Sequence, residues 1–231
     1  MEWDAPAIVL DVRPYGEGDA IATVMTAEHG AHRGLARGGG ARSRTAIWQP
    51  GNLVQARWVA RLADQLGSLT AELVHPGAAL AMEDPLGLAM LSAACAVTEG
   101  ALPERAPQPR VFEGLLRLIA RLPQGPAMLT DLVRWEAVLL AELGYGLDLT
   151  SCAVTSDGAG VWTSRLLRLP AFLVGDGEAT PPDWRDGLRL TGHFLERDAF
   201  GHHHRPLPVA RQMLYDRVAA LAAESEQQDA G

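Results

Sequence analysis

Hydrophobic and polar residues alternate along the first 75 residues of the chain. In residues 7–13, Ile8, Leu10 and Val12 share one face and Asp11 and Arg13 the other, as in a half-buried strand. Turns rich in glycine and proline separate such segments. The pattern predicts strands over residues 7–13, 21–26, 31–38, 52–61 and 66–74. Five short strands indicate an all-β barrel or sandwich, and a five-stranded open barrel is the OB-fold.

The hydrophobic period changes from two to 3.6 after His75-Pro76-Gly77. We therefore expect an α+β protein, with a five-stranded OB-fold barrel over residues 1–78 and a mostly α-helical domain over residues 79–231. Helices are predicted over residues 85–98, 110–122, 130–143, 183–195 and 206–221. Residues 151–182 carry no strong signal apart from a turn at 156–158.

Composition places the chain among globular proteins. It has 231 residues, 48% hydrophobic and 21% charged, and no apolar run of membrane-spanning length. The acidic start MEWDAP has neither the cationic lead nor the apolar stretch of a signal peptide. Its two cysteines suit a reducing cytosol better than a disulfide framework. We expect a cytoplasmic protein without a membrane partner.

Positive charge is concentrated in one band of this acidic chain. The net charge is −8, yet residues 29–61 contain six arginines and no acid, with two tryptophans among them. Arginine interleaved with aromatic residues on short strands is typical of a groove for single-stranded nucleic acid. The candidate DNA-binding residues are Arg33, Arg37, Arg42, Arg44, Trp48, Arg57 and Arg61. Trp58 falls on the inward face of its strand and is predicted to be core; a solvated strand face is the alternative reading of the band.

Other motifs give no catalytic or metal site. Three adjacent histidines, 202–204, do not converge easily on one ion, and no cysteine or carboxylate set completes a site. The glycines 38–40 lack a P-loop lysine and a following helix. No base partner for Cys152 is visible. We expect no enzyme activity, cofactor or bound metal, although an enzyme on a barrel-plus-helix scaffold remains an alternative.

Several short segments, spread over nearly the whole chain, together resemble the RecO family of bacterial recombination mediators. The N-terminal ones are Ala7-Ile-Val-Leu, Tyr15-Gly-Glu-Gly-Asp19, Met25-Thr-Ala-Glu-His-Gly30, Gly34-Leu-Ala-Arg37, Gln49-Pro-Gly51 and residues 52–61. The C-terminal ones are Glu142-Leu-Gly-Tyr-Gly-Leu-Asp148, Cys152-Ala-Val-Thr155 and Arg205-Pro-Leu-Pro-Val-Ala-Arg211. One feature departs from the family: some members carry a four-cysteine zinc site, whereas only Cys95 and Cys152 are present here.

The resemblance implies an N-terminal OB-fold, a helical C-terminal domain and a role in DNA repair and homologous recombination. Such proteins bind single- and double-stranded DNA and anneal complementary strands. They engage the C-terminal tail of single-stranded DNA-binding protein (SSB) and, with RecR, help RecA replace SSB on gapped DNA. This implies association with the nucleoid at damage. Whether RecF takes part is left open, and a generic OB-fold binder of single-stranded nucleic acid, possibly RNA, is the alternative.

A site for the acidic SSB tail should pair an apolar groove with one or two cations for the terminal carboxylate. Four arginines on predicted helices lie beside apolar faces and are the partner-binding candidates: Arg110, Arg117, Arg121 and Arg134. Arg134, just before the Glu142 motif, is the first choice. Ordinary surface arginines are the alternative reading.

Overall fold

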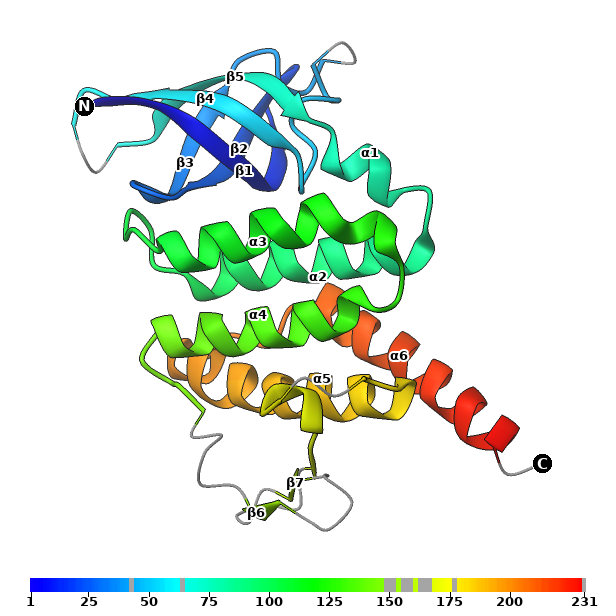
Figure 1. Ribbon diagram of the computed structural model, residues 1–231. Coiled ribbons are helices and arrows are strands. Elements are labelled where there is room, and N and C mark those ends of the chain that lie inside the picture. The colour runs from blue at the N-terminus through cyan, green and yellow to red at the C-terminus, as the bar shows by residue number, and fades with distance from the viewer. Residues whose placement is uncertain are drawn as a thin grey trace. The chain divides into compact units, whose positions relative to one another are not determined.

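The computed structural model describes residues 1–41, 44–62, 65–147, 153–154, 160–161, 168–175 and 178–229. Strands come first along the chain and helices follow (Figure 1). The N-terminal strands are β1 (Glu2–Tyr15), β2 (Asp19–Thr26), β3 (Gly30–Ala36), β4 (Leu53–Val59) and β5 (Gly67–His75). All five lie where the alternating pattern predicts them, and β1 is longer than predicted at both ends.

These strands form a closed barrel in the order β1-β2-β3-β5-β4, with β4 pairing back onto β1. Neighbouring strands are antiparallel except for β3 and β5, which meet in parallel at Gly34–Gly67 and Leu35–Ser68. A bulge between Val9 and Asp11 interrupts the pairing of β1 with β2 and bends the strand as a closed sheet requires. The predicted OB-like barrel is confirmed.

The barrel core follows the predicted alternation. On β4, Val54, Ala56 and Trp58 are buried, whereas Gln55 and Arg57 are exposed. Small residues such as Ala22 and Ala36 share the core with the larger Trp3 and Leu69. Small and large inward side chains together fill a narrow barrel. Arginines that alternate with these core residues therefore point outward.

Helices make up most of the remaining chain. They are α1 (Gly77–Ala81), α2 (Pro85–Ala101), α3 (Pro109–Arg121), α4 (Met128–Glu142), α5 (Pro181–Phe194) and α6 (Val209–Asp229). Shorter elements are the 3₁₀ turns η1 (Leu122–Gln124), η2 (Ala171–Leu173) and η4 (Gly201–His203), and the π-helix η3 (Leu195–Phe200). A small sheet joins β6 (Ala153–Val154), β7 (Gly160–Val161) and β8 (Arg168–Leu169). The predicted turn at 156–158 lies outside the described residues.

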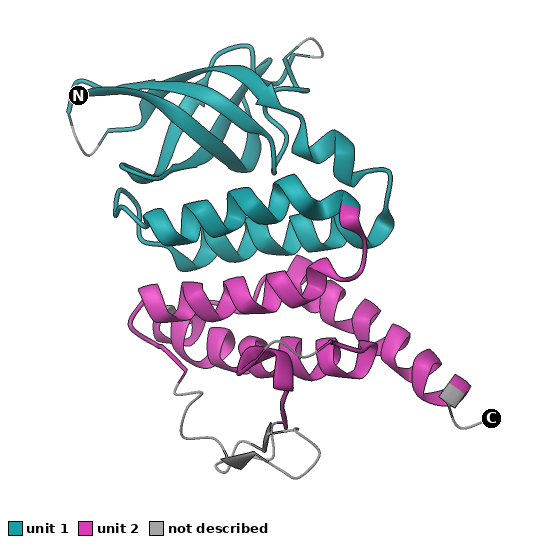
Figure 2. Cartoon of the chain, viewed as in Figure 1, with its two compact units in different colours: residues 1–123 teal, residues 124–231 magenta. Residues whose placement is uncertain are grey.

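The chain divides into two compact units, Met1–Pro123 and Gln124–Gly231 (Figure 2). In the first unit, α2 packs against β1 and α3 against β2. Leu91 of α2 lies so close to Gly51 that a β-carbon there would meet it at 2.5 Å. The boundary between the two compact units therefore lies later in the chain than the change of hydrophobic period at residues 75–77. Among the described helices, none is long and apolar enough to cross a membrane.

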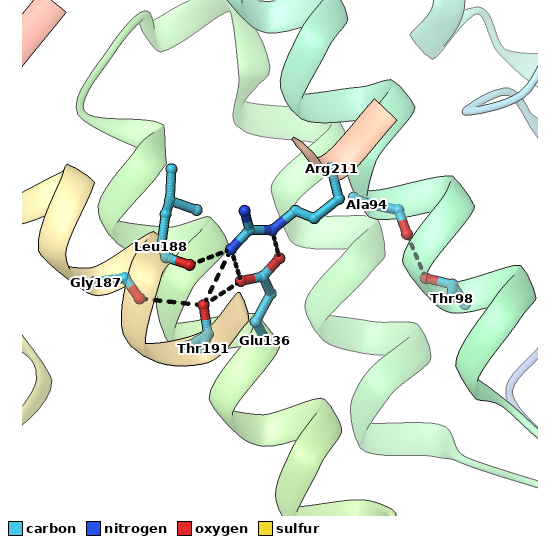
Figure 3. A network of polar contacts seen from close by, with 7 residues as sticks. All are labelled: Ala94, Thr98, Glu136, Gly187, Leu188, Thr191 and Arg211. Atoms are coloured by element: carbon cyan, nitrogen blue, oxygen red, sulfur yellow. Dashed lines mark hydrogen bonds and ion pairs between the residues drawn. The ribbon is translucent and has the colours of Figure 1, made fainter. Parts of the chain in front are cut away.

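The second unit is joined through a buried polar network (Figure 3). Glu136 of α4 and Arg211 of α6 are each 1% exposed, and the Nε of Arg211 donates to Oε1 of Glu136 at 2.5 Å. Its Nη2 donates to Oε2 of Glu136 at 2.9 Å and to the carbonyl oxygen of Leu188 in α5 at 2.7 Å. The hydroxyl of Thr191 also donates to Glu136. One ion pair thus ties three helices together.

Candidate nucleic-acid interface

The loop between β3 and β4 is held firmly on the barrel. Asn52 is 1% exposed, and its Nδ2 donates to the carbonyl oxygens of Ala46 (2.7 Å) and Ile47 (3.1 Å). Its Oδ1 accepts the backbone N–H of Ala78, which lies in the first turn of α1. This buried amide therefore fixes the part of the loop that follows Arg44.

A groove of about 580 Å³ opens between this loop and the outer faces of β4 and β5. Its charged lining consists of Arg37, Arg44, Arg57, Asp4 and Glu72. Three guanidinium groups against two carboxylates leave the groove cationic, and guanidinium groups suit phosphate oxygens. The structure thus brings together three of the six arginines that the sequence singles out.

The other two described arginines of the band are not among the residues that line the groove. Arg33 lies on the outer face of β3, outside the groove, and its Nη2 is 2.5 Å from Oε1 of Glu104. Arg61 is exposed just beyond the end of β4 and also lies outside the groove lining. Arg42 lies outside the described residues. Of the five described arginines of the band, three therefore line the groove and two lie outside it.

The sequence predicts Trp48 as a loop aromatic that can stack on a base. It does sit in the loop, but it is 5% exposed and belongs to the barrel core. Trp48 also lines the groove, and base stacking by this residue stays a prediction. Trp58 is core as predicted: it is 2% exposed, and its Nε1 donates to the carbonyl oxygen of Arg33 at 3.0 Å.

An aromatic cluster that the sequence analysis missed lies around Trp58. Trp3 stacks on His29 at 5.3 Å between ring centroids, and His32 meets Trp58 edge-on at 5.0 Å. The guanidinium of Arg105 lies 5.7 Å from the ring of Trp58. Burial, together with the nearby charge of Arg105, holds the pKa of His32 below its usual value. The pattern could not indicate Arg105, which lies between the predicted helices 85–98 and 110–122.

The partner-binding candidates fall in both units. Arg110, Arg117 and Arg121 are exposed on α3 of the first unit. Arg134 belongs to the second unit, where its Nε and Nη2 donate to the carbonyl oxygen of Phe172 and its Nη2 also to that of Gly175. These hydrogen bonds tie Arg134 to η2, and a role of any of the four arginines in binding a partner stays a prediction.

The remaining motifs behave as side chains of a packed protein. Among the residues that the structure describes, no group of three or more His, Cys, Asp and Glu could hold a metal ion. His202 stacks on Tyr145 at 5.7 Å. Burial raises the pKa of the Cys95 thiol to about 12, which leaves little thiolate at neutral pH. Cys152 lies outside the described residues.

Fold and groove together define a barrel-plus-helix protein with an arginine-lined groove on its barrel. The chain matches the family "Recombination protein O N terminal" over residues 1–76 and "Recombination protein O C terminal" over residues 82–206. The DNA repair protein RecO of Granulibacter bethesdensis is 57% identical over the full length of both chains. The RecO proteins of Gluconacetobacter diazotrophicus and Acidiphilium cryptum are each 53% identical, covering 96% and 94% of this chain and 96% of their own. The chain therefore belongs to the RecO family of DNA repair proteins.

Proposed function

We propose that this chain is a mediator of homologous recombination in DNA repair, acting on DNA in the cytoplasm and nucleoid. It binds single- and double-stranded DNA on the outer face of its barrel and anneals complementary strands. With RecR, it helps RecA replace SSB on gapped DNA. Binding and positioning of strands suffice for this role, so no catalytic residue is required.

The observation that carries the proposal is the groove lined by Arg37, Arg44 and Arg57. Phosphates of single- and double-stranded DNA suit its guanidinium groups, and phosphate contacts carry no sequence information. Its arginines come from the end of β3, from the pinned loop and from β4. A groove built on a barrel in this way can hold one strand while leaving its bases open to a complementary strand.

Recruitment to SSB-coated DNA requires a second site. The exposed arginines of α3 suit the acidic tail of SSB, because a guanidinium pairs with the terminal carboxylate. RecR is the partner for RecA loading, and RecF and RecA are indirect partners. An OB-fold binder of single-stranded nucleic acid without mediator function is the alternative, and it needs no tail site.

A fluorescence-anisotropy titration tests the proposal. Labelled oligo(dT) is titrated with the full chain at several salt concentrations, and a labelled SSB-tail peptide is titrated separately. A mediator binds both, and its DNA affinity falls steeply with salt. DNA binding without peptide binding would leave only the alternative. Failure to bind DNA near physiological salt would overturn the proposal.

A further inference from the structure

Two arginines of the band are already paired with carboxylates of the same chain. Arg57, which lines the groove, places its Nε 2.7 Å from Oε1 of Glu2, and its Nη2 is also paired with that oxygen. Arg33 is paired with Glu104. All four side chains are about half exposed, with 46–55% of each accessible. The pairs are therefore within reach of a ligand from solvent.

Glu104 is held in position by the backbone around it. The segment after α2 forms a parallel bridge to β3 between Ala31 and Glu104, and the N–H of Arg105 donates to the carbonyl oxygen of Ala31 at 2.8 Å. Gly30, at φ +70°, leaves room for this segment: a β-carbon there would lie 2.2 Å from the carbonyl oxygen of Ala106. Glu104 is thus placed beside Arg33 by strand-like pairing, independently of the ion pair.

Glu2 is placed by strand register. β1 pairs with β4 so that Asp4 lies opposite Arg57 and Glu2 opposite Val59. Glu2 is therefore the diagonal neighbour of Arg57, a distance that long side chains bridge. Asp4, directly opposite, accepts a hydrogen bond from Gln55 instead. The strand register alone therefore places the carboxylate of Glu2 beside Arg57, one of the groove arginines.

We propose that Glu2 and Glu104 set the affinity of the nucleic-acid interface by occupying Arg57 and Arg33 until DNA phosphates displace them. The inference rests on the proposed function and concerns how tightly the same surface binds. Each carboxylate offers the guanidinium the same kind of oxygen acceptor as a phosphate, so binding exchanges one ion pair for another. Such exchange keeps the arginines oriented when DNA is absent and makes strand release easier.

The expected gain in DNA affinity follows from the exposure of the two ion pairs. Exposed ion pairs contribute little to stability, so removing the competing carboxylate should tighten DNA binding by about two- to five-fold per site. The test compares Glu2→Gln, Glu104→Gln and the double variant with the wild type, in anisotropy titrations of labelled oligo(dT) at low salt. Glu83→Gln is the charge-matched control, because Glu83 is exposed in the turn before α2 and no ion pair involves it among the described residues.

A second comparison separates a local effect from general charge. Glu2→Gln is repeated in the Arg57→Ala background, and Glu104→Gln in the Arg33→Ala background. We expect each glutamine to tighten binding in the wild type and to act no more strongly than Glu83→Gln where its arginine is missing. Circular dichroism confirms that each variant is folded.

Two results would overturn the proposal while the proposed function stands. In the first, the wild type binds DNA and neither Glu2→Gln nor Glu104→Gln binds it more tightly. In the second, Glu83→Gln tightens DNA binding as much as they do. Absence of DNA binding in the wild type and in every variant would instead overturn the proposed function, and the inference with it. Binding that appears only in the glutamine variants would support the inference directly.

Discussion

Buried and exposed ion pairs have different roles in this chain. Glu136–Arg211 is 1% exposed on both sides, whereas Arg57–Glu2 is about half exposed. A half-exposed pair exchanges readily with solvent or a ligand, but a buried one cannot lose one partner without leaving a charge in the core. The same kind of ion pair is therefore exchangeable on the barrel surface and structural in the second unit.

Replacing Arg211 by methionine should lower the free energy of unfolding by about 3–5 kcal/mol, because Glu136 is left buried without its partner. The double variant Glu136→Leu, Arg211→Met should recover much of this loss, since an apolar pair removes both charges. Urea denaturation of the full chain measures both.

Arg189→Met on α5 is the control, because Arg189 is exposed; a change within about 0.5 kcal/mol is expected. A double variant that is no more stable than Arg211→Met would show that the missing hydrogen bonds to Leu188 and Thr191, rather than the uncompensated charge, dominate the effect.

For single residues, the sequence pattern predicted which way a side chain points better than which residue it contacts. The period of two correctly placed Trp58 inward and Arg57 outward. It could not show that Arg57 meets Glu2, because that contact depends on strand register across 55 residues. Nor could it show that Trp48 packs into the barrel core or that Arg134 donates to the backbone of η2, because a loop position and a helix face do not tell which residues of the rest of the chain pack there.

Among the elements, α2 and the segment that follows it do most to connect helices with the barrel. Cys95 of α2 is buried, with its Sγ 3.9 Å from the carbonyl oxygen of Val9 in β1. The next segment adds a bridge to β3 at Ala31. The pattern predicted the helix itself, because apolar periodicity is local. It missed the pairing of residues 104–105 with β3, because this is made by backbone groups that every sequence carries.

Cys95 provides a reporter for release of α2 from β1. In a Cys152→Ser variant, a thiol reagent such as DTNB at pH 8 should leave Cys95 essentially unmodified, because burial both blocks access and raises the pKa of the thiol to about 12. One thiol per chain should react once denaturant is added. Rapid labelling of the native variant would mean that α2 opens from the barrel readily, and a Cys95→Ser, Cys152→Ser variant gives the background.

For the molecule as a whole, the proposed mediator role needs DNA and the SSB tail to be bound by different surfaces. The groove arginines belong to the barrel, and the tail candidates Arg110, Arg117 and Arg121 to α3. The helical part was predicted as a separate domain, yet α3 packs in the same compact unit as the barrel. Hydrophobic period identifies element types, but it does not say which elements share a core.

Two triple variants should therefore separate the two binding functions. Arg37→Ala, Arg44→Ala, Arg57→Ala should weaken oligo(dT) binding and lower the slope of log affinity against log salt by about 2, roughly 0.7 for each phosphate that is no longer neutralised. It should leave SSB-tail peptide binding unchanged. Arg110→Ala, Arg117→Ala, Arg121→Ala should do the reverse, because the carboxylate of the tail then has no cations to pair with.

Both triple variants remove three positive charges from the first unit, so each serves as the charge-matched control for the other. If both weakened DNA binding equally and with the same change in salt slope, the groove would have no special role. The DNA affinity would then depend only on the overall charge of the protein. If the α3 variant bound the peptide as well as the wild type, the tail site would have to lie elsewhere. Opposite effects in the two variants would show that DNA and the SSB tail are bound through different residues, which simultaneous binding during the exchange of SSB for RecA requires.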